Sequence, residues 1–394
     1  MTLTKYESSL LKELVALDTS VDKKTDYKDM VKVLRRECES IGAETHIIAP
    51  SKEGESINEN IVARIDNGSD YTLALNAHYD TVPALSSEWK TPPFELVQIG
   101  DKLYGRGTND DKGAITTILS AIREAKHYPN LELFFTCDEE AGSKYGMDYV
   151  AENYKIKSSG AVVADGEPVL FVGGSGGFVC RIIITGKGHH AGWPSKALNP
   201  LELGIPFIDR MKEFQKIIGT QVSKYSDVGD SRDSAVTGRS VLTTINGGTI
   251  GNQIPNEMVA TFNVRCIPEG DVEATFNQFA NFFKKERKAY LEALAASGVM
   301  NLKIELDEAV AKKRNYCANE NSDIVMRMKR ITGEEKLYGS HGGNDASAFV
   351  LNGVDTVSYG VFNESAHMNN EYVLERDIAR VRNSFIRLLE SYKE

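Results

Sequence analysis

The stretch FFTCDEEAGS at residues 134–143 places three acids side by side directly after an apolar run. Neighbouring carboxylates repel one another, and neither a strand nor a helix gains from crowding them. Two other apolar runs, TLALNA and AVVA, also lead into acids or a histidine, and the stretch GRGTNDDKG adds a further pair of acids. The residues concerned are His78, Asp80, Asp110, Asp111, Asp138, Glu139, Glu140 and Asp165, with His367 far downstream in FNESAHMNNEYV. Converging groups of one charge need a counter-charge, so this pattern predicts a site for one or two cations.

The mixture of imidazole nitrogens and carboxylate oxygens indicates which cation such a site would hold. Zn²⁺ takes both donor types, with Co²⁺ and Mn²⁺ as alternatives, whereas an all-oxygen set would favour Mg²⁺ or Ca²⁺. In two-metal hydrolases the ions lie roughly 3.5–4 Å apart and activate a shared water molecule. Each motif alone has a simpler explanation, because an HxD triplet is often a capped turn and Asp110 and Asp111 could cap a helix. Strand ends that each deliver such residues favour the metal site.

The elements that would carry these residues alternate between strand and helix. We expect helices at 4–16, 26–41 and 113–125 and strands at 61–65, 72–77, 131–136 and 161–164. The first helix opens with a capping box formed by Thr4 and Glu7. Short apolar strands of this kind are typical of a buried sheet with helices on both faces. Because sites in open α/β sheets form outside the carboxyl ends of the strands, the acids and histidines should converge at one edge.

The pattern changes between residues 178 and 307. We expect strands at 178–185, 240–245, 257–267 and 301–306 and helices at 200–218 and 271–297, with the polar segment 221–240 as a loop. This order is βαββαβ, the ferredoxin-like arrangement. After about residue 310 the α/β pattern resumes and ends with an amphipathic helix. The sequence therefore predicts an α/β fold with a catalytic mixed-sheet domain, residues 1–177 and 310–394, interrupted by an inserted ferredoxin-like domain, residues 178–309. The glycines of GGSGG (173–177) do not have the GxGxxG spacing and are interpreted as a hinge.

Composition excludes several classes of function. Lys and Arg number 46 against 56 Asp and Glu, a net charge of −10 without a basic stripe, which argues against nucleic acid or an anionic membrane as a partner. No apolar run approaches the ~18 residues of a membrane span, and the N-terminus lacks the features of a signal peptide. The 5 cysteines are widely spaced without a CxxC pair, which predicts reduced thiols in a cytoplasmic protein.

Motifs along nearly the whole chain resemble those of one known enzyme family. They are HYDTVP (78–83), EWKTPPFE (88–95), GDKLYGRGTNDDKG (100–113), CDEEAGS (137–143), HHAGWPSKALNP (189–200), GGTIGNQIPNEMVATFNVR (247–265), GGNDASAF (342–349) and SAHMNNEYV (365–373). In this order they resemble the dizinc metallopeptidase and amidohydrolase family of succinyl-diaminopimelate desuccinylase, acetylornithine deacetylase and bacterial glutamate carboxypeptidase. The resemblance implies a zinc-peptidase domain split by a lid or dimerisation domain, with two Zn²⁺ per chain.

The resemblance also implies a role for each metal-binding residue. His78 and Asp165 would bind one zinc, Glu140 and His367 the other, and Asp110 would bridge the two. Glu167 is an alternative to Asp165, which is favoured because it directly follows its strand. A cis peptide is implied between Asp110 and Asp111. Asp138 is expected to lie beside the site without binding a metal.

Three further residues would carry the chemistry. Glu139 would be the general base for attack by a metal-bound hydroxide and would later protonate the leaving amine. Asp80 would hydrogen-bond His78 and fix its tautomer. His190 of the inserted domain, from the same or a partner subunit, would stabilise the oxyanion. His189 is the alternative, but His190-Ala191-Gly192 fits the family pattern better.

Substrate contacts follow from the later motifs. By resemblance, Asn252 and Arg265 would contact a substrate carboxylate or the oxyanion, and Gly343 and Asn344 would present backbone or amide groups. An exposed structural arginine is the alternative for Arg265, since it alternates with apolar residues. The implied reaction is amide hydrolysis in N-acyl amino acids or short peptides, of the deacylase or carboxypeptidase type, by a homodimer formed through the inserted domain.

Two alternatives to that function stay open. The tract EWKTPPFE favours the deacylase and carboxypeptidase side over a di- or tripeptide aminopeptidase of the same family. An inactive homologue acting as a binding protein would show a broken set of site residues, and the sequence contains the full set.

Overall fold

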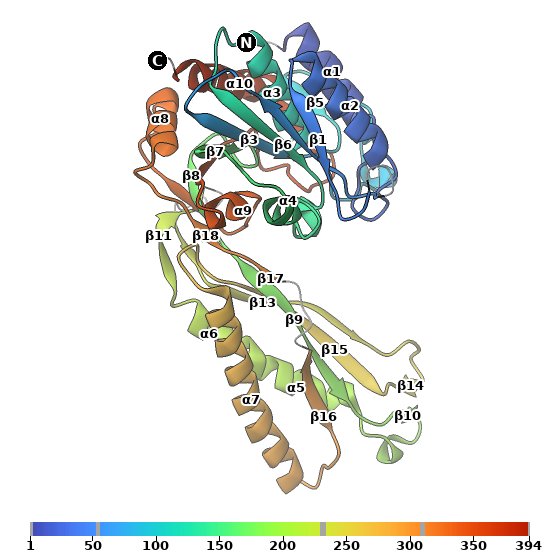
Figure 1. Cartoon of the computed structure of the whole chain (residues 1–394). Coiled ribbons are helices and arrows are strands. Elements are labelled where there is room, and N and C mark those ends of the chain that lie inside the picture. Colours follow the sequence, from blue (N-terminus) through green and yellow to red (C-terminus); the bar gives the residue numbers. More distant parts are fainter. Residues whose placement is uncertain (1–2, 53–55, 229–233, 308–311, 393–394) are drawn as a thin grey trace. The chain divides into compact units, whose positions relative to one another are not determined.

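The computed structural model describes residues 3–52, 56–228, 234–307 and 312–392 (Figure 1). The chain divides into two compact units. The first unit comprises Met1–Val172, Cys317–Tyr338 and Asn344–Glu394, and the second comprises Gly173–Tyr316 and Gly339–Gly343. The second unit thus begins before the predicted boundary at 177/178, and the predicted boundary at 309/310 lies outside the described residues.

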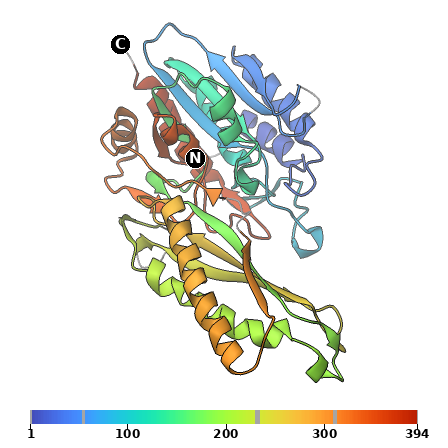
Figure 2. The ribbon, with the colours of Figure 1, turned by 60° about the horizontal axis from the view of Figure 1, so that its bottom comes forward.

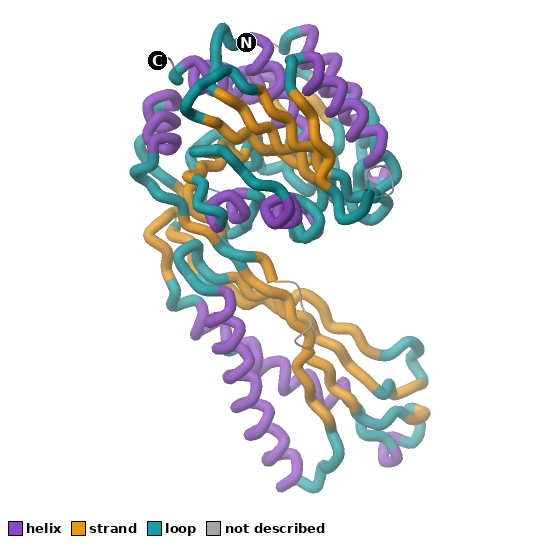
Figure 3. The backbone as a smooth tube through the Cα atoms, in the orientation of Figure 1, coloured by secondary structure: helices purple, strands orange, loops and turns teal. Residues whose placement is uncertain are grey.

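The first unit is built around a mixed sheet with helices on both faces, which confirms the predicted fold class (Figure 1). Its helices are α1 (Lys5–Val15), α2 (Tyr27–Ser40), α3 (Lys112–Glu124), α4 (Met147–Asn153), α8 (Asp323–Thr332), α9 (Ala346–Leu351) and α10 (Glu375–Glu390), with 3₁₀ turns η1 (Ser86–Glu88) and η2 (Glu139–Ala141). Its strands are β1 (Glu44–Ile48), β2 (Asn60–Ile65), β3 (Thr72–His78), β4 (Val97–Ile99), β5 (Lys102–Tyr104), β6 (Asn130–Thr136), β7 (Gly160–Val163), β20 (Asp355–Ser358) and β21 (Tyr372–Leu374). Strands β8 (Phe171–Gly174), β18 (Tyr316–Cys317) and β19 (Tyr338–Ser340) lie where the chain passes between the units. Helices α1, α3 and α10 pack together on one face of the sheet, and α4 and α9 lie on the other (Figures 1 and 3).

The centre of this sheet is parallel, and that places the ends of its strands together. The strands of the first unit run in the order β1-β2-β6-β3-β7-β20-β8. Strands β6, β3, β7 and β20 are parallel neighbours, whereas the pairs β1–β2, β2–β6 and β20–β8 are antiparallel. His78 at the end of β3 is the register partner of Thr136 at the end of β6, and Asn76 is the partner of Val163 at the end of β7. The loops that follow these strands therefore leave the sheet at one edge.

Local signals at the N-terminus confirm the first predicted helix. The N–H of Glu7 donates to Thr4 Oγ1 at 3.1 Å and the N–H of Thr4 donates to Glu7 Oε2 at 2.7 Å, so the predicted capping box is present. A second, smaller sheet of the first unit runs in the order β21-β5-β4, with Tyr372 opposite Tyr104. This pairing brings the segment after Tyr104 close to residues near the C-terminus.

The second unit has the predicted βαββαβ order. Its helices are α5 (Pro200–Lys212), α6 (Phe214–Ile218) and α7 (Val272–Ala296), with the 3₁₀ turn η3 (Pro194–Lys196). Its strands are β9 (Gly177–Thr185), β10 (His189–His190), β11 (Val222–Ser226), β12 (Ala235–Thr237), β13 (Arg239–Gly247), β14 (Gln253–Ile254), β15 (Glu257–Arg265), β16 (Lys303–Asp307) and β17 (Lys312–Lys313). The main strands form an antiparallel sheet in the order β13-β15-β9-β16. The three helices cover one face of this sheet, where alternate residues such as Phe178, Ile182 and Phe262 are buried against them (Figure 2).

One expectation for the second unit needs correction. The segment 221–240, predicted to be a loop, contains β11 and β12 in antiparallel pairing and the start of β13. Ser223 of β11 faces inward and Val222 faces outward, and only Lys224 and Tyr225 follow the usual order, so the apolar alternation that marks a strand is interrupted there. The glycines interpreted as a hinge also have a packing reason, since a Cβ atom on Gly174 would lie 2.4 Å from Tyr316 Cε1.

Among the described residues, no helix combines the length and apolarity that a membrane crossing requires.

Candidate metal centre and active site

The residues predicted at the strand ends meet at one edge of the first unit's sheet. His78 ends β3, Glu139 and Glu140 lie in η2 directly after β6, and Asp165 follows β7. Ligand atoms of His78, Asp110 and Glu140 lie within 4.8 Å of one another, and so do those of His78, Glu139 and Asp165. The two groups share His78, so they form one cluster. Glu167, the alternative to Asp165, belongs to neither group.

Asp110 lies between the two histidines predicted to bind metal. Its Oδ1 is 2.9 Å from His78 Nε2 and its Oδ2 is 2.9 Å from His367 Nε2. The same nitrogen of His367 lies 2.9 Å from Glu140 Oε2. The predicted cis peptide between Asp110 and Asp111 is present. Asp110 therefore has one carboxylate oxygen beside each histidine, as a bridging ligand would.

The donor set fits divalent cations. Asp110 Oδ1 is buried and accepts no hydrogen bond, although it lies 2.9 Å from His78 Nε2. Within the described part of the chain, no lysine or arginine pairs with Asp110 or Glu140, whose ion-pair partners are imidazoles. Buried carboxylates without a cationic side chain need another source of positive charge. Mixed nitrogen and oxygen donors are those that zinc and neighbouring transition metals accept.

The pKa shifts within the cluster also indicate a site that stabilises positive charge. Burial favours the neutral ring of His78, but the carboxylates of Asp110 and Asp80 raise its pKa above the usual value. Contacts with Asp110 and Glu140 raise the pKa of His367 to about 11. Burial and then the charge of Asp110 raise the pKa of Glu140 to about 7. The carboxylates thus stabilise positive charge between them, and a metal ion would supply that charge in place of protons.

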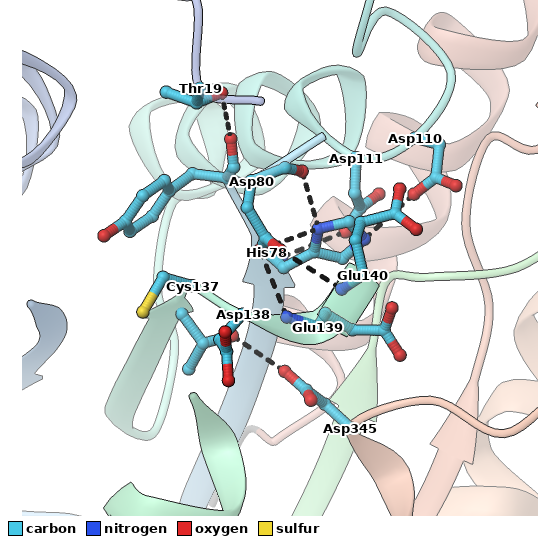
Figure 4. A network of polar contacts seen from close by, with 12 residues as sticks. Thr19, His78, Asp80, Asp110, Asp111, Cys137, Asp138, Glu139, Glu140 and Asp345 are labelled. Carbon is cyan, nitrogen blue, oxygen red and sulfur yellow. Dashed lines mark hydrogen bonds and ion pairs between the residues drawn. The ribbon is translucent and has the colours of Figure 1, made fainter. Parts of the chain in front are cut away.

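Asp80 orients both His78 and the acidic turn (Figure 4). His78 Nδ1 lies 3.0 Å from the Asp80 carbonyl oxygen and 3.4 Å from Asp80 Oδ1, so Nδ1 is the nitrogen that donates to Asp80, and Nε2 is the nitrogen that faces Asp110 and would be free to bind a metal. The Asp80 carboxylate also accepts the backbone N–H groups of Glu139, at 3.3 Å, and Glu140, at 3.1 Å. One fully buried carboxylate therefore holds a histidine and the two neighbouring glutamates in place.

Asp138 has a structural contact of its own. Its Oδ2 accepts the N–H of Tyr145 at 2.9 Å, and its Oδ1 lies 3.5 Å from Lys24 Nζ. Its backbone has a φ of 64°, which turns the chain sharply at the end of β6. Asp138 shapes the turn that presents Glu139 and Glu140, and its expected lack of a metal contact stays a prediction.

Asp345 is a buried acid of the site that the sequence reasoning missed. Its Oδ1 accepts a hydrogen bond from Ser143 Oγ at 2.8 Å and its Oδ2 accepts one from Thr136 Oγ1 at 2.7 Å. Burial and then the charge of Glu139 raise the pKa of Asp345 to about 6. Asp345 thereby ties the end of β6 to Ser143, at the far end of the acidic turn. Figure 4 shows Asp345 beside this turn. Its position directly after Asn344 in the GGND motif is the signal that could have identified it.

In the second unit, His190 and Asn252 line one cavity of about 350 Å³. The N–H of Gly192 donates to His190 Nδ1 at 3.0 Å, so the neutral ring carries its proton on Nε2. The N–H of Ala191 donates to the carbonyl of Asn252 at 2.9 Å and holds the two segments together. His189 lines the same cavity, so its place as the alternative to His190 stays open.

The other predicted substrate residues have contacts within their own units. Arg265 Nε donates to Asn263 Oδ1 at 3.0 Å, on the sheet face opposite the helices. Asn344 Nδ2 donates to the carbonyl of Asp165 at 2.8 Å and therefore supports the backbone of that predicted ligand. A Cβ atom on Gly343 would lie 2.9 Å from the Ser175 carbonyl oxygen, so the glycine permits a close approach. Their contacts with substrate stay predictions.

Comparison with known proteins decides the family. Residues 74–391 match the description Peptidase family M20/M25/M40. The chain belongs to this family. Membership confirms the resemblance found in the motifs and makes this M20 chain a metallopeptidase-type hydrolase, in agreement with the chemistry of the cluster.

Named relatives and solved structures extend over nearly all of the M20 chain. A probable succinyl-diaminopimelate desuccinylase from Staphylococcus aureus is 26% identical over 99% of this chain and 96% of its own. An uncharacterized metallohydrolase from Methanocaldococcus jannaschii is 29% identical over 84% of this chain and 83% of its own. The M20 metallo-carboxypeptidase Sso-CP2 from Sulfolobus solfataricus covers 98% of this chain and 99% of its own with a TM-score of 0.75 and 20% identity. The di-peptidase Dug1p from Saccharomyces cerevisiae covers 98% and 96% with a TM-score of 0.77 and 15% identity. At these identities the two structures show a shared fold.

Proposed function

We propose that this M20 chain is a dinuclear metal-dependent hydrolase of amide bonds in N-acyl amino acids or short peptides. The observation that carries the proposal is the position of Asp110, with one oxygen 2.9 Å from His78 and the other 2.9 Å from His367. The residues that would hold two Zn²⁺ ions, with Co²⁺ or Mn²⁺ as alternatives, are His78, Asp110, Glu140, Asp165 and His367. When bound, such ions lower the pKa of water and polarise the scissile carbonyl group.

Residues of the chain itself would transfer the protons and stabilise the negative charge of the tetrahedral intermediate. Glu139 lies within 4.8 Å of ligand atoms of His78 and Asp165, close enough to take a proton from the attacking water and return it to the leaving nitrogen. Asp80 keeps Glu139 in position by accepting its backbone N–H. The Nε2–H tautomer of His190 makes this ring a donor suited to the oxyanion of the tetrahedral intermediate.

The substrate class is supported by the names of the relatives. One relative is named for succinyl-diaminopimelate desuccinylase activity, and the similar structures are named as a carboxypeptidase and a di-peptidase. We therefore assign this chain to the deacylase and carboxypeptidase side, with a di- or tripeptide aminopeptidase as the second candidate. A panel of acetyl-amino acids, succinyl-amino acids and dipeptides with free or blocked amino groups separates them. Cleavage that requires a free α-amino group would overturn the first assignment.

The variant Glu139→Gln tests the mechanism. It should retain two metal ions per chain, because Glu139 is not among the proposed ligands, and lose at least ~100-fold in kcat. Glu335→Gln, which changes a solvent-exposed glutamate, is the matched control and should behave as the wild-type enzyme. Full activity in the Glu139 variant would refute its role as the base. Active wild-type enzyme with well under two ions per chain would refute the dinuclear model.

We also propose that the chain forms a homodimer through the second unit. In the described part of its sheet, β13 is an edge strand, and its residues Val241 and Ile245 are 52% and 46% exposed. An exposed edge with apolar side chains is a ready surface for pairing with another copy. Light scattering should show a dimer for the wild-type protein and a monomer for Val241→Lys with Ile245→Lys. A monomeric wild-type protein would refute the proposal.

A further inference from the structure

A buried glutamate outside the predicted site collects hydrogen-bond donors from the segment that carries Asp110. Glu371 is fully buried, and so is its partner Arg106. Its Oε2 lies 2.5 Å from Arg106 Nη1 and accepts the N–H of Gly107 at 3.1 Å. Its Oε1 accepts the N–H of Asn109 at 2.8 Å and the N–H of Asp110 itself at 3.1 Å.

These contacts fix the backbone of the segment 105–110 rather than one side chain. The carbonyl of Glu371 also accepts the N–H of Gly105 at 3.1 Å, in continuation of the β5–β21 pairing. Gly107 has a φ of 82°, which a residue with a side chain would adopt only with strain. The backbone amides of the segment turn inward onto one carboxylate, and the residue that carries it directly precedes β21.

A second set of contacts joins the same segment to the loop of His367. Asn109 Nδ2 donates to the carbonyl of Asn363 at 3.3 Å and to Ser365 Oγ at 3.3 Å. The N–H of Asn363 donates in return to Asn109 Oδ1 at 3.1 Å. Since His367 lies between Ser365 and Glu371 in the sequence, both ends of its loop are attached to the Asp110 segment.

We propose that Glu371 is a positioning residue for the metal centre. By holding the backbone of the Asp110 segment, Glu371 keeps the Asp110 carboxylate between His78 and His367. The inference rests on the proposed function, because it assigns Asp110 to the metal ions. Its physical basis is that the Asp110 carboxylate must stay within contact distance of both histidines. Asp110 has a carboxylate oxygen 2.9 Å from each histidine nitrogen, so a displacement of about 1 Å in its backbone would remove one of the two contacts. Groups that orient a metal ligand in this way typically contribute ~10–100-fold to metal affinity.

The test compares Glu371→Gln and Glu371→Asp with the matched control Glu364→Gln. The amide of Gln places donor hydrogens against donors, whereas Asp keeps the charge but is one methylene shorter. Glu364 lies in the same segment, is exposed, and bonds to the Tyr372 hydroxyl at 2.6 Å, away from Asp110. Each protein is stripped of metal, its thermal unfolding is measured, and Zn²⁺ is titrated by calorimetry. The visible spectrum of the Co²⁺-loaded protein then reports the ligand geometry.

We expect Glu371→Gln to bind Zn²⁺ ~10–100-fold more weakly, with an altered Co²⁺ spectrum and a lower kcat at similar KM, and Glu371→Asp to recover part of the affinity. The control should match the wild-type protein in thermal unfolding, Zn²⁺ affinity, Co²⁺ spectrum and steady-state kinetics. Wild-type Zn²⁺ affinity and spectrum in a folded Glu371→Gln protein would overturn the proposal, because only the fold would then depend on Glu371. Failure of both variants to fold would overturn it as well.

The proposed function is judged on the wild-type protein alone, since two bound ions without amide hydrolysis would refute the function and leave the positioning role intact.

Discussion

Replacement of Asp80 by alanine should weaken both the fold and the metal centre. The Asp80 carboxylate is fully buried and accepts the N–H groups of Glu139 and Glu140 at 3.3 and 3.1 Å. Alanine leaves these two donors buried without acceptors, at a cost of ~1–3 kcal/mol each. The metal-free variant should therefore lose about 2–6 kcal/mol in its free energy of unfolding. Asparagine keeps one acceptor oxygen, so Asp80→Asn should lose about half as much.

The effect on metal binding has a separate cause. Asp80 Oδ1 lies 3.4 Å from His78 Nδ1, and its loss lets the imidazole rotate or change tautomer. We expect ~10–100-fold weaker Zn²⁺ binding in Asp80→Ala. Since the same substitution frees the turn that carries Glu139 and Glu140, kcat should fall even when Zn²⁺ is saturating.

Denaturant unfolding of the metal-free protein and calorimetric titration with Zn²⁺ measure the two effects independently. Asp70→Asn is the control, because Asp70 is an exposed aspartate just before β3. An Asp80→Ala protein with control-like stability would show that water or backbone adjustment replaces the lost acceptor. Unchanged Zn²⁺ affinity would show that the His78 ring is held by the Asp80 backbone carbonyl alone. Either result refutes the corresponding half of the reasoning.

Further predictions address other parts of the chain. His190→Ala should lower kcat by ~100–1,000-fold while Zn²⁺ affinity stays at the wild-type value, since the proposed role of this ring is to donate to the oxyanion and not to bind a metal. Steady-state kinetics with parallel metal titration checks this, and a loss of Zn²⁺ binding would contradict it. Removal of metal by a chelator should abolish activity and lower the melting temperature, and Zn²⁺ at 100 times its Kd should restore about 2.7 kcal/mol of stability; a melting temperature that is independent of Zn²⁺ would count against the site. Burial raises the pKa of Cys38 and Cys180 to about 12 and that of Cys266 to about 11, so these thiols should resist iodoacetamide at pH 8 in the folded protein. The less buried Cys317 should react first. Peptide mass mapping measures the order of labelling, and early labelling of Cys38 would refute this prediction.

The sequence predicted the parts of the site that depend on strand ends. His78 and Asp165 could be identified because each directly follows an apolar run, and parallel strands deliver the residues that follow them to one edge. The βαββαβ order of the second unit was readable for a similar reason, since its strands alternate apolar and polar residues. Strand β11 was missed because Ser223, a polar residue, faces inward there. Strand β12 was missed because its three residues are too few to show a periodic pattern, although its Val236 is buried.

The supporting residues could not be predicted in this way, because their partners are distant in the sequence and polar. Glu371 contacts the segment around Asp110, and Asp345 contacts Thr136 and Ser143, in each case across the fold. A single glutamate or aspartate in a loop has no periodic neighbours that mark it as buried. Only the three-dimensional structure shows that these acids are surrounded by donors.

Some carboxylates of the site accept hydrogen bonds from backbone or hydroxyl groups, and others face only imidazoles. This difference explains how one site accommodates so many carboxylates. Asp80 and Asp138 accept backbone N–H groups, which compensate their charges, and Asp345 accepts two hydroxyl groups, although burial and the charge of Glu139 still raise its pKa to about 6. Asp110 and Glu140 instead face imidazoles, and one oxygen of Asp110 accepts no hydrogen bond at all. Removal of a compensated acid leaves buried donors unpaired and should mainly destabilise the fold, whereas removal of Glu140, whose pKa is raised to about 7 by burial and the charge of Asp110, relieves repulsion in the metal-free protein. The metal-free Glu140→Gln protein should therefore be at least as stable as the metal-free wild type, although it binds Zn²⁺ far more weakly.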